Sequence, residues 1–103
     1  MLQIAEFQRR NRSESIVVTK HGKIRLLERN ISVDDILYAI SSGIIIKQYD
    51  DDRPLPSCLI LGKDRSNRSL HLVVSHDDQY IYLITAYYPD PEIWSADFTK
   101  KKE

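Results

Sequence analysis

Three long polar side chains recur every four residues near the start of the chain: His21, Arg25 and Arg29. On a helix, this spacing places them one above another on a single face. Two guanidinium groups one turn apart can hold a phosphate through forked hydrogen bonds, and a neighbouring imidazole can act as a base. The alternative is a solvated helix face whose arginines pair with the acidic residues 50–52. The spacing alone leaves both interpretations open.

Two later segments carry further candidate residues. The stretch 69–75 alternates as a strand does, with leucine and valine on one face and His71 on the other. If the apolar face packs against helices, His71 lies on the open face of the sheet. Thr85 and Tyr87 lie together in a second alternating stretch, where Tyr87 can stack on a base or donate a proton. The alternatives are an exposed or structural histidine and a tyrosine that packs across strands.

The charge is balanced overall but not along the chain. Among 103 residues, Lys and Arg number 15 and Asp and Glu number 15, so the formal net charge is +0. Residues 1–29 hold seven of the Lys and Arg residues against three Glu, which leaves the remainder acidic. A basic N-terminal third can attract phosphate. The alternative is again a solvated charged face.

The composition excludes several classes of site. The single cysteine, Cys58, excludes an internal disulfide and any metal site built on several cysteines, and it fits a reducing cytosol. No window approaches the ~20 apolar residues of a membrane span, and residues 1–10 do not look like a secretory signal. The three histidines are scattered and no phosphate-cradling glycine loop is present, so we expect no metal and no cofactor. These features predict a soluble cytoplasmic protein.

Capping residues and apolar spacing predict two helices that must position the basic face. Thr19 and Ser32 are placed to cap helices within 19–31 and over 33–42, and Gly43 is expected to end the second helix as a C′ glycine. The first helix is expected to face the core with the aliphatic residues at helical spacing, which are Ile24, Leu27 and Ile31.

Short β-branched or alternating runs then predict four strands, at 44–49, 57–62, 69–75 and 80–88. A short helix is expected at 92–98. Short connections favour an antiparallel meander, so the predicted fold is α+β: two N-terminal helices packed on a four-stranded antiparallel sheet, with a short C-terminal helix.

The length predicts a single domain, 1–103. Within it we expect an N-terminal arm or helix at 1–15, a core at 16–98 and a basic tail at 99–103. The core begins with the β-branched run 16–18, which is long enough only for a very short strand or a lead-in.

Three motifs follow one another along residues 19–98. The first holds His21, Arg25 and Arg29, and the second is Tyr49-Asp50-Asp51-Asp52-Arg53-Pro54. The third combines Leu70-His71-Leu72 with Ile84-Thr85-Ala86-Tyr87-Tyr88-Pro89-Asp90-Pro91-x-x-Trp94. In this order the motifs resemble domain-of-unknown-function family 4258. One departure is Asn30, which stands where the family commonly has Gly.

The arrangement of helices and sheet in that family is similar to the BrnT and RelE/ParE group of small toxin ribonucleases. The resemblance implies a ribonuclease or a ribonuclease-derived fold, with a cognate antitoxin protein as partner. The first hypothesis is therefore a metal-independent endoribonuclease of toxin type that acts on RNA. Cutting RNA without a metal needs a base, an acid and cations for the phosphate. The residues assigned to these roles are His21 and His71 as base and acid, Arg25 and Arg29 on the phosphate, Tyr87 as a stacking or orienting group, and Arg53 and Thr85 in support.

The alternative function is a non-catalytic domain that binds a protein or a nucleic acid through the same basic face. In that case His21 and Arg25 would be structural links between helix and sheet. The sequence leaves open whether the protein is an enzyme and whether it forms a homodimer.

Overall fold

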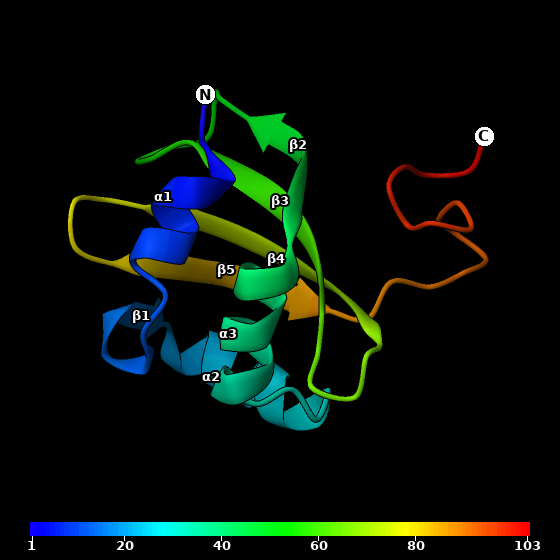
Figure 1. Ribbon diagram of the computed structural model, residues 1–103, viewed down its shortest axis with the longest axis horizontal. Coiled ribbons are helices and arrows are strands. Elements are labelled where there is room, and N and C mark those ends of the chain that lie inside the picture. The colour runs from blue at the N-terminus through cyan, green and yellow to red at the C-terminus, as the bar shows by residue number, and fades with distance from the viewer.

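The computed structural model describes residues 1–103 as three helices and a five-stranded sheet (Figure 1). The helices are α1 (Ile4–Arg9), α2 (Lys20–Glu28) and α3 (Val33–Ser42), and a single 3-10 turn lies at Ser13–Ser15. The strands are β1 (Ile16–Val18), β2 (Ile44–Tyr49), β3 (Ser57–Lys63), β4 (Ser69–His76) and β5 (Ile81–Tyr87). The predicted α+β class and the predicted strands from β2 to β5 are confirmed. No helix combines the length and the apolar character of a membrane span.

The sheet is mixed, with the strand order β1-β5-β4-β3-β2. Strands β2 to β5 form the expected antiparallel meander, but β1 adds a parallel strand beside β5. The prediction of a four-stranded antiparallel sheet is therefore wrong in strand number and direction. The β-branched run 16–18 is short, yet it pairs with the first half of β5, from Ile16 opposite Ile81 to Val18 opposite Leu83.

Helix α3 covers one face of the sheet and begins with a complete capping box (Figure 1). The Ser32 hydroxyl accepts a hydrogen bond from the Asp35 backbone N–H at 3.1 Å, and the Asp35 carboxylate accepts from the Ser32 backbone N–H at 3.2 Å. Asp35 thus occupies the third position of the capping box, where glutamate or glutamine is usual. The predicted helix over 33–42 is confirmed, and it buries Ile36, Ala39 and Ile40 in the core.

Two glycines allow α3 to approach the sheet closely. Gly43 ends α3 as predicted, but it does so as the C-cap residue with φ −90°, and not in the left-handed conformation typical of a C′ glycine. A Cβ atom on Gly43 would lie 2.5 Å from the carbonyl oxygen of Ala39 and 2.6 Å from Cγ2 of Ile60. A Cβ atom on Gly62 would overlap the backbone of Ala39 as well. Both positions need glycine for space and not for backbone freedom.

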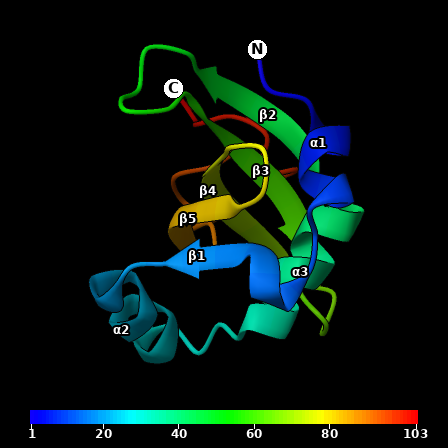
Figure 2. The ribbon, with the colours of Figure 1, turned by 90° about the vertical axis from the view of Figure 1, so that its left-hand side faces the viewer.

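Helix α2 lies beside β1 and apart from α3 (Figure 2). Leu26 is its buried side chain, whereas Ile24 is 48% exposed and Leu27 is 80% exposed. The prediction that Ile24 and Leu27 face the core is wrong, because α2 turns Leu26 toward the sheet instead. Ile31, just beyond the helix, is buried as expected.

The C-terminal residues form turns in place of the predicted helix at 92–98. The Asp90 and Asp97 carboxylates accept hydrogen bonds from the backbone N–H groups of Glu92 and Thr99, which stabilises local turns. An antiparallel bridge then pairs Trp94 with Lys101. Residues 89–103 form the C-terminal segment, which reaches the buried ring of His71 on the sheet face opposite the core.

Candidate functional site

A narrow groove of about 190 Å³ lies between α2 and β5, and it contains four of the predicted site residues. His21, Arg25 and Arg29 contribute from α2 and its C-terminal cap, and Thr85 contributes from β5. The other lining residues are Val18, Thr19, Gly22, Leu26, Leu83, Ile84 and Ala86. We call this the α2–β5 groove. No carboxylate lines it.

The N-terminal cap of α2 sets the residue at which the helix begins, and therefore which side chains share its basic face. The Thr19 hydroxyl accepts a hydrogen bond from the Gly22 backbone N–H at 2.9 Å, which starts the helix at Lys20. His21 and Arg25 are exposed, and neither forms a hydrogen bond or an ion pair with the protein through its side chain. The alternative of arginines paired with residues 50–52 does not occur. Both groups are free to meet a ligand.

Arg29 is held by the edge of β5. Its Nη1 donates hydrogen bonds to the carbonyl oxygen of Ala86 at 2.7 Å and to the Thr85 hydroxyl at 3.3 Å. Strand β1 ends at Val18, opposite Leu83, so the second half of β5 has no strand neighbour on that side. Arg29 satisfies a carbonyl there and ties α2 to the sheet. Its guanidinium therefore has a structural role as well as a place in the groove.

His71 and Tyr87 lie elsewhere, on the sheet face that the C-terminal segment covers. The His71 ring is fully buried, with Nε2 2.9 Å from the carbonyl oxygen of Phe98 and Nδ1 3.2 Å from the Tyr87 hydroxyl. The His71 ring also packs edge to face against the Trp94 ring, with 4.5 Å between the ring centroids. The expectation that His71 lies on an open face is wrong, because residues far along the chain cover it.

Burial favours the neutral form of His71, and the hydrogen bonds then assign its tautomer. A carbonyl oxygen only accepts, so Nε2 carries the proton and donates it to Phe98, which leaves Nδ1 to accept from the Tyr87 hydroxyl. Burial lowers the pKa of His71, and the hydrogen bond to Phe98 offsets this only in part. Burial also raises the pKa of Tyr87. The pair acts as a link between β4, β5 and the C-terminal segment.

Arg53 also lies outside the α2–β5 groove. Its Nη1 donates to the carbonyl oxygens of Asp51 at 3.0 Å and Asp52 at 3.1 Å, within the loop between β2 and β3. The structure thus brings together four of the seven predicted residues. It keeps His71, Tyr87 and Arg53 apart from them.

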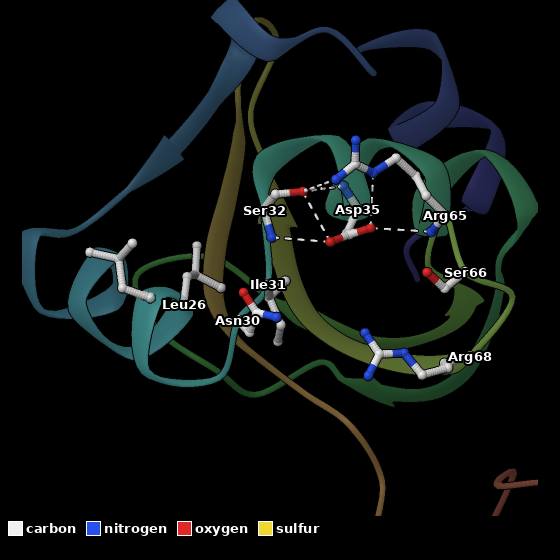
Figure 3. Close-up of a pocket in the computed structure, with 9 residues that line it drawn as sticks. Leu26, Asn30, Ile31, Ser32, Asp35, Arg65, Ser66 and Arg68 are labelled. Carbon is white, nitrogen blue, oxygen red and sulfur yellow. Dashed lines mark hydrogen bonds and ion pairs between the residues drawn. The ribbon is translucent and has the colours of Figure 1, made fainter.

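A second pocket, of about 400 Å³, contains residues that the sequence did not single out (Figure 3). Asp35 accepts hydrogen bonds from the backbone N–H of Arg65 at 3.1 Å and from its Nε at 3.2 Å. Burial alone would raise the pKa of Asp35, but the hydrogen bonds from Arg65 and Ser32 outweigh it and lower the pKa to about 2. On the other side of the pocket, Arg68 donates to Asp64 at 2.9 Å and lies over the Tyr88 ring.

Each guanidinium in this second pocket already faces a carboxylate, unlike the side chains of Arg25 and His21. The network fastens the loop between β3 and β4 to the start of α3, which is a structural task. A sequence signal existed, because Asp64 and Arg68 stand four residues apart in a polar hairpin loop. This spacing does not predict that Asp35 contacts the loop, because Asp35 and its partner Arg65 stand 30 positions apart in the sequence.

Comparison with known proteins gives a family. No curated protein and no solved structure matches the chain. The family model described as "Domain of unknown function (DUF4258)" matches residues 18–88, which run from the end of β1 to the residue after β5. The match includes the whole α2–β5 groove and leaves out the C-terminal segment. Because the matched residues make up more than half of the chain, the protein belongs to the DUF4258 family.

Proposed function

We propose that the protein binds single-stranded RNA through the α2–β5 groove, with a backbone phosphate between Arg25 and Arg29. The observation that carries this proposal is the pair of free, exposed side chains His21 and Arg25 in a groove without a carboxylate. Guanidinium groups are well suited to phosphate because they present several donors in one plane.

The surroundings of the groove support an anionic ligand. Lys20 and Lys23 lie outside this groove but add positive charge to α2, neither of them in an ion pair, and Glu28 is the helix's one acidic residue. The first backbone N–H groups of a helix lack acceptors within the helix, so this end of α2 also favours negative charge. A narrow basic groove that follows one phosphate chain is typical of proteins that bind single strands.

A metal-independent endoribonuclease is the second proposal, and the exposed imidazole of His21 favours it. In that reaction His21 removes the 2′-hydroxyl proton, the 2′ oxygen attacks phosphorus, and the bond to the 5′ oxygen breaks. Arg25 and Arg29 stabilise the charge that develops on the phosphate, and the departing oxygen takes its proton from water. His71 does not line the groove, so this proposal rests on His21 alone. A toxin role with an antitoxin partner is the finer form of the same proposal.

One experiment tests both proposals. A fluorescein-labelled single-stranded RNA of twelve nucleotides is titrated with protein, binding is followed by anisotropy, and the recovered RNA is run on a denaturing gel. Arg25→Ala is expected to weaken binding about tenfold. It is also expected to reduce the slope of log binding constant against log salt concentration by about 0.7, since one phosphate contact is lost. His21→Ala is expected to abolish any cleavage while the protein still binds.

Arg53→Ala is the matched control, because Arg53 is an exposed arginine outside the groove. It is expected to bind RNA as the wild type does. Equal losses in Arg25→Ala and Arg53→Ala would contradict a specific groove. Intact RNA after long incubation with wild-type protein would contradict the ribonuclease and leave the binding proposal standing.

A further inference from the structure

A second groove lies along the other side of α2, and it is mainly aliphatic. Its volume is about 690 Å³, within the range of ligand and peptide pockets. Strand β1, helix α2 and the start of α3 form its walls, through Ser13, Ile16, Val17, Val18, Lys23, Leu26, Leu27, Ile31, Ser32 and Val33. We call this the β1–α2 groove. It is distinct from the α2–β5 groove, although Val18 and Leu26 touch both.

Aliphatic side chains in the β1–α2 groove remain exposed to water. Leu27 is 80% exposed, Val17 is 41% exposed and Val33 is 39% exposed. Single exposed aliphatic residues are ordinary, but a contiguous set around a hollow is typical of an interaction surface. The fold itself offers nothing further to cover Leu27.

The backbone beside this groove also lacks a partner. β1 is the outermost strand of the sheet and pairs with β5 on one side only (Figure 2). The Ile16 N–H donates to the carbonyl oxygen of Ser13, but no strand pairs with the outer edge of β1 next to the aliphatic hollow. An unpaired edge of this kind accepts an extended segment from another chain.

The charge of the groove restricts what the segment can carry. Lys23 is the only charged residue that lines it, and the Lys23 ammonium forms no ion pair. Lys20, one turn earlier on α2, is likewise exposed and without an ion pair. The complementary charge on an occupant is therefore negative.

Spacing along α2 adds a positional requirement. Lys23 and Leu27 are four residues apart on the helix, which corresponds to ~6 Å along its axis. Residues two apart on a strand lie on the same face and are separated by ~6.6 Å. An extended segment that runs alongside α2 can therefore place a carboxylate at Lys23 and an aliphatic side chain at Leu27 when one residue separates the two.

We propose that the β1–α2 groove binds an extended segment of a protein partner in which an acidic and an aliphatic residue stand two positions apart. The segment pairs with the free edge of β1, its carboxylate meets Lys23, and its aliphatic side chain covers Leu27. This interaction is independent of RNA binding, because it uses the opposite side of α2.

Two synthetic peptides test the proposal. Each has leucine two positions before and two positions after its central residue, so it can pair with β1 in a parallel or an antiparallel direction. One is acetyl-Thr-Leu-Thr-Glu-Thr-Leu-Thr-amide, and the other has Lys in place of Glu. The Glu peptide is expected to bind at least tenfold more tightly than the Lys peptide, with amide shifts at Ile16–Val18 in NMR spectra. Lys23→Glu is expected to reverse the preference, and Leu27→Ser to weaken binding of the Glu peptide at least tenfold.

Two control variants isolate the groove. Ile24→Ser removes an exposed aliphatic residue of α2 that does not line the groove, and it is expected to bind as the wild type does. Arg25→Ala is expected to keep peptide binding even where RNA binding is lost. Absent binding, or equal binding of both peptides, would overturn the proposal. Self-association of the wild type that Leu27→Ser abolishes would also overturn it, since the occupant would then be a second copy.

Discussion

Replacing Gly62 with alanine is expected to lower the free energy of unfolding by about 3 kcal/mol. A Cβ atom at this position would overlap the carbonyl oxygen of Ala39 and lie 2.7 Å from its carbonyl carbon. These are backbone atoms of α3, so the strain cannot be relieved by rotating a side chain. In a domain of this size the loss corresponds to a fall in Tm of about 12 to 24 °C. Urea denaturation followed by circular dichroism measures it.

Gly22→Ala is the matched control for this prediction. A Cβ atom there meets only side-chain atoms, Cγ1 of Val18 at 3.0 Å and Oγ1 of Thr19 at 3.1 Å. Alanine also favours the helix by about 1 kcal/mol over glycine. The free energy of unfolding of this variant should stay within about 1 kcal/mol of the wild-type value. If both variants lost stability equally, close approach of α3 to β3 would not explain the need for Gly62.

Replacing His71 with alanine is expected to cost about 3 kcal/mol of stability, from the cavity and from two lost hydrogen bonds. The carbonyl oxygen of Phe98 and the Tyr87 hydroxyl would lose their common partner. Urea denaturation gives the loss, and the fluorescence of Trp94, which packs on the ring, reports release of the C-terminal segment. His21→Ala should leave stability unchanged, because His21 is exposed and makes no side-chain hydrogen bond.

The same histidine predicts a pH dependence. Burial holds the pKa of His71 below its usual value of 6.5, so the unfolded chain takes up the proton first as the pH falls. The stabilisation is therefore present above pH 6.5 and is lost as the pH drops below it, at up to about 1.4 kcal/mol per pH unit. His71→Gln, which can still donate to Phe98, should lack this loss between pH 7 and 5. A His71→Gln profile parallel to the wild-type profile would contradict the assignment.

Local signals predicted the parts of the fold that depend on neighbouring residues. The helix at 33–42 follows from the Ser32 cap and the apolar spacing after it, and both act within one or two turns. The antiparallel strands follow from β-branched runs joined by short turns. The position of β1 could not be predicted in this way, because three residues carry little pattern and their partners lie about 65 positions later in the chain.

The errors around the candidate site arose where a distant contact decides burial. Ile24 and Leu27 have helical spacing, but so does a stripe through Leu26, and only the contact of α2 with β5 selects between them. Strand alternation placed His71 on the correct face. It could not show that the C-terminal segment, with Trp94 and Phe98, covers that face. His21, Arg25 and Arg29, on one helix, were grouped correctly with Thr85. His71 and Tyr87 contact each other but lie apart from that group.

Chemical-shift mapping with RNA tests the proposed α2–β5 groove most directly. Uniformly ¹⁵N-labelled protein is titrated with an unlabelled single-stranded RNA of ten nucleotides, and each backbone amide is followed. We expect the largest shifts along Lys20–Glu28 and at Thr85 and Ala86, with Arg65 and Arg68 unchanged. Shifts confined to the Asp35–Arg65 pocket or to the C-terminal segment, or no shifts at all, would contradict RNA binding by the α2–β5 groove.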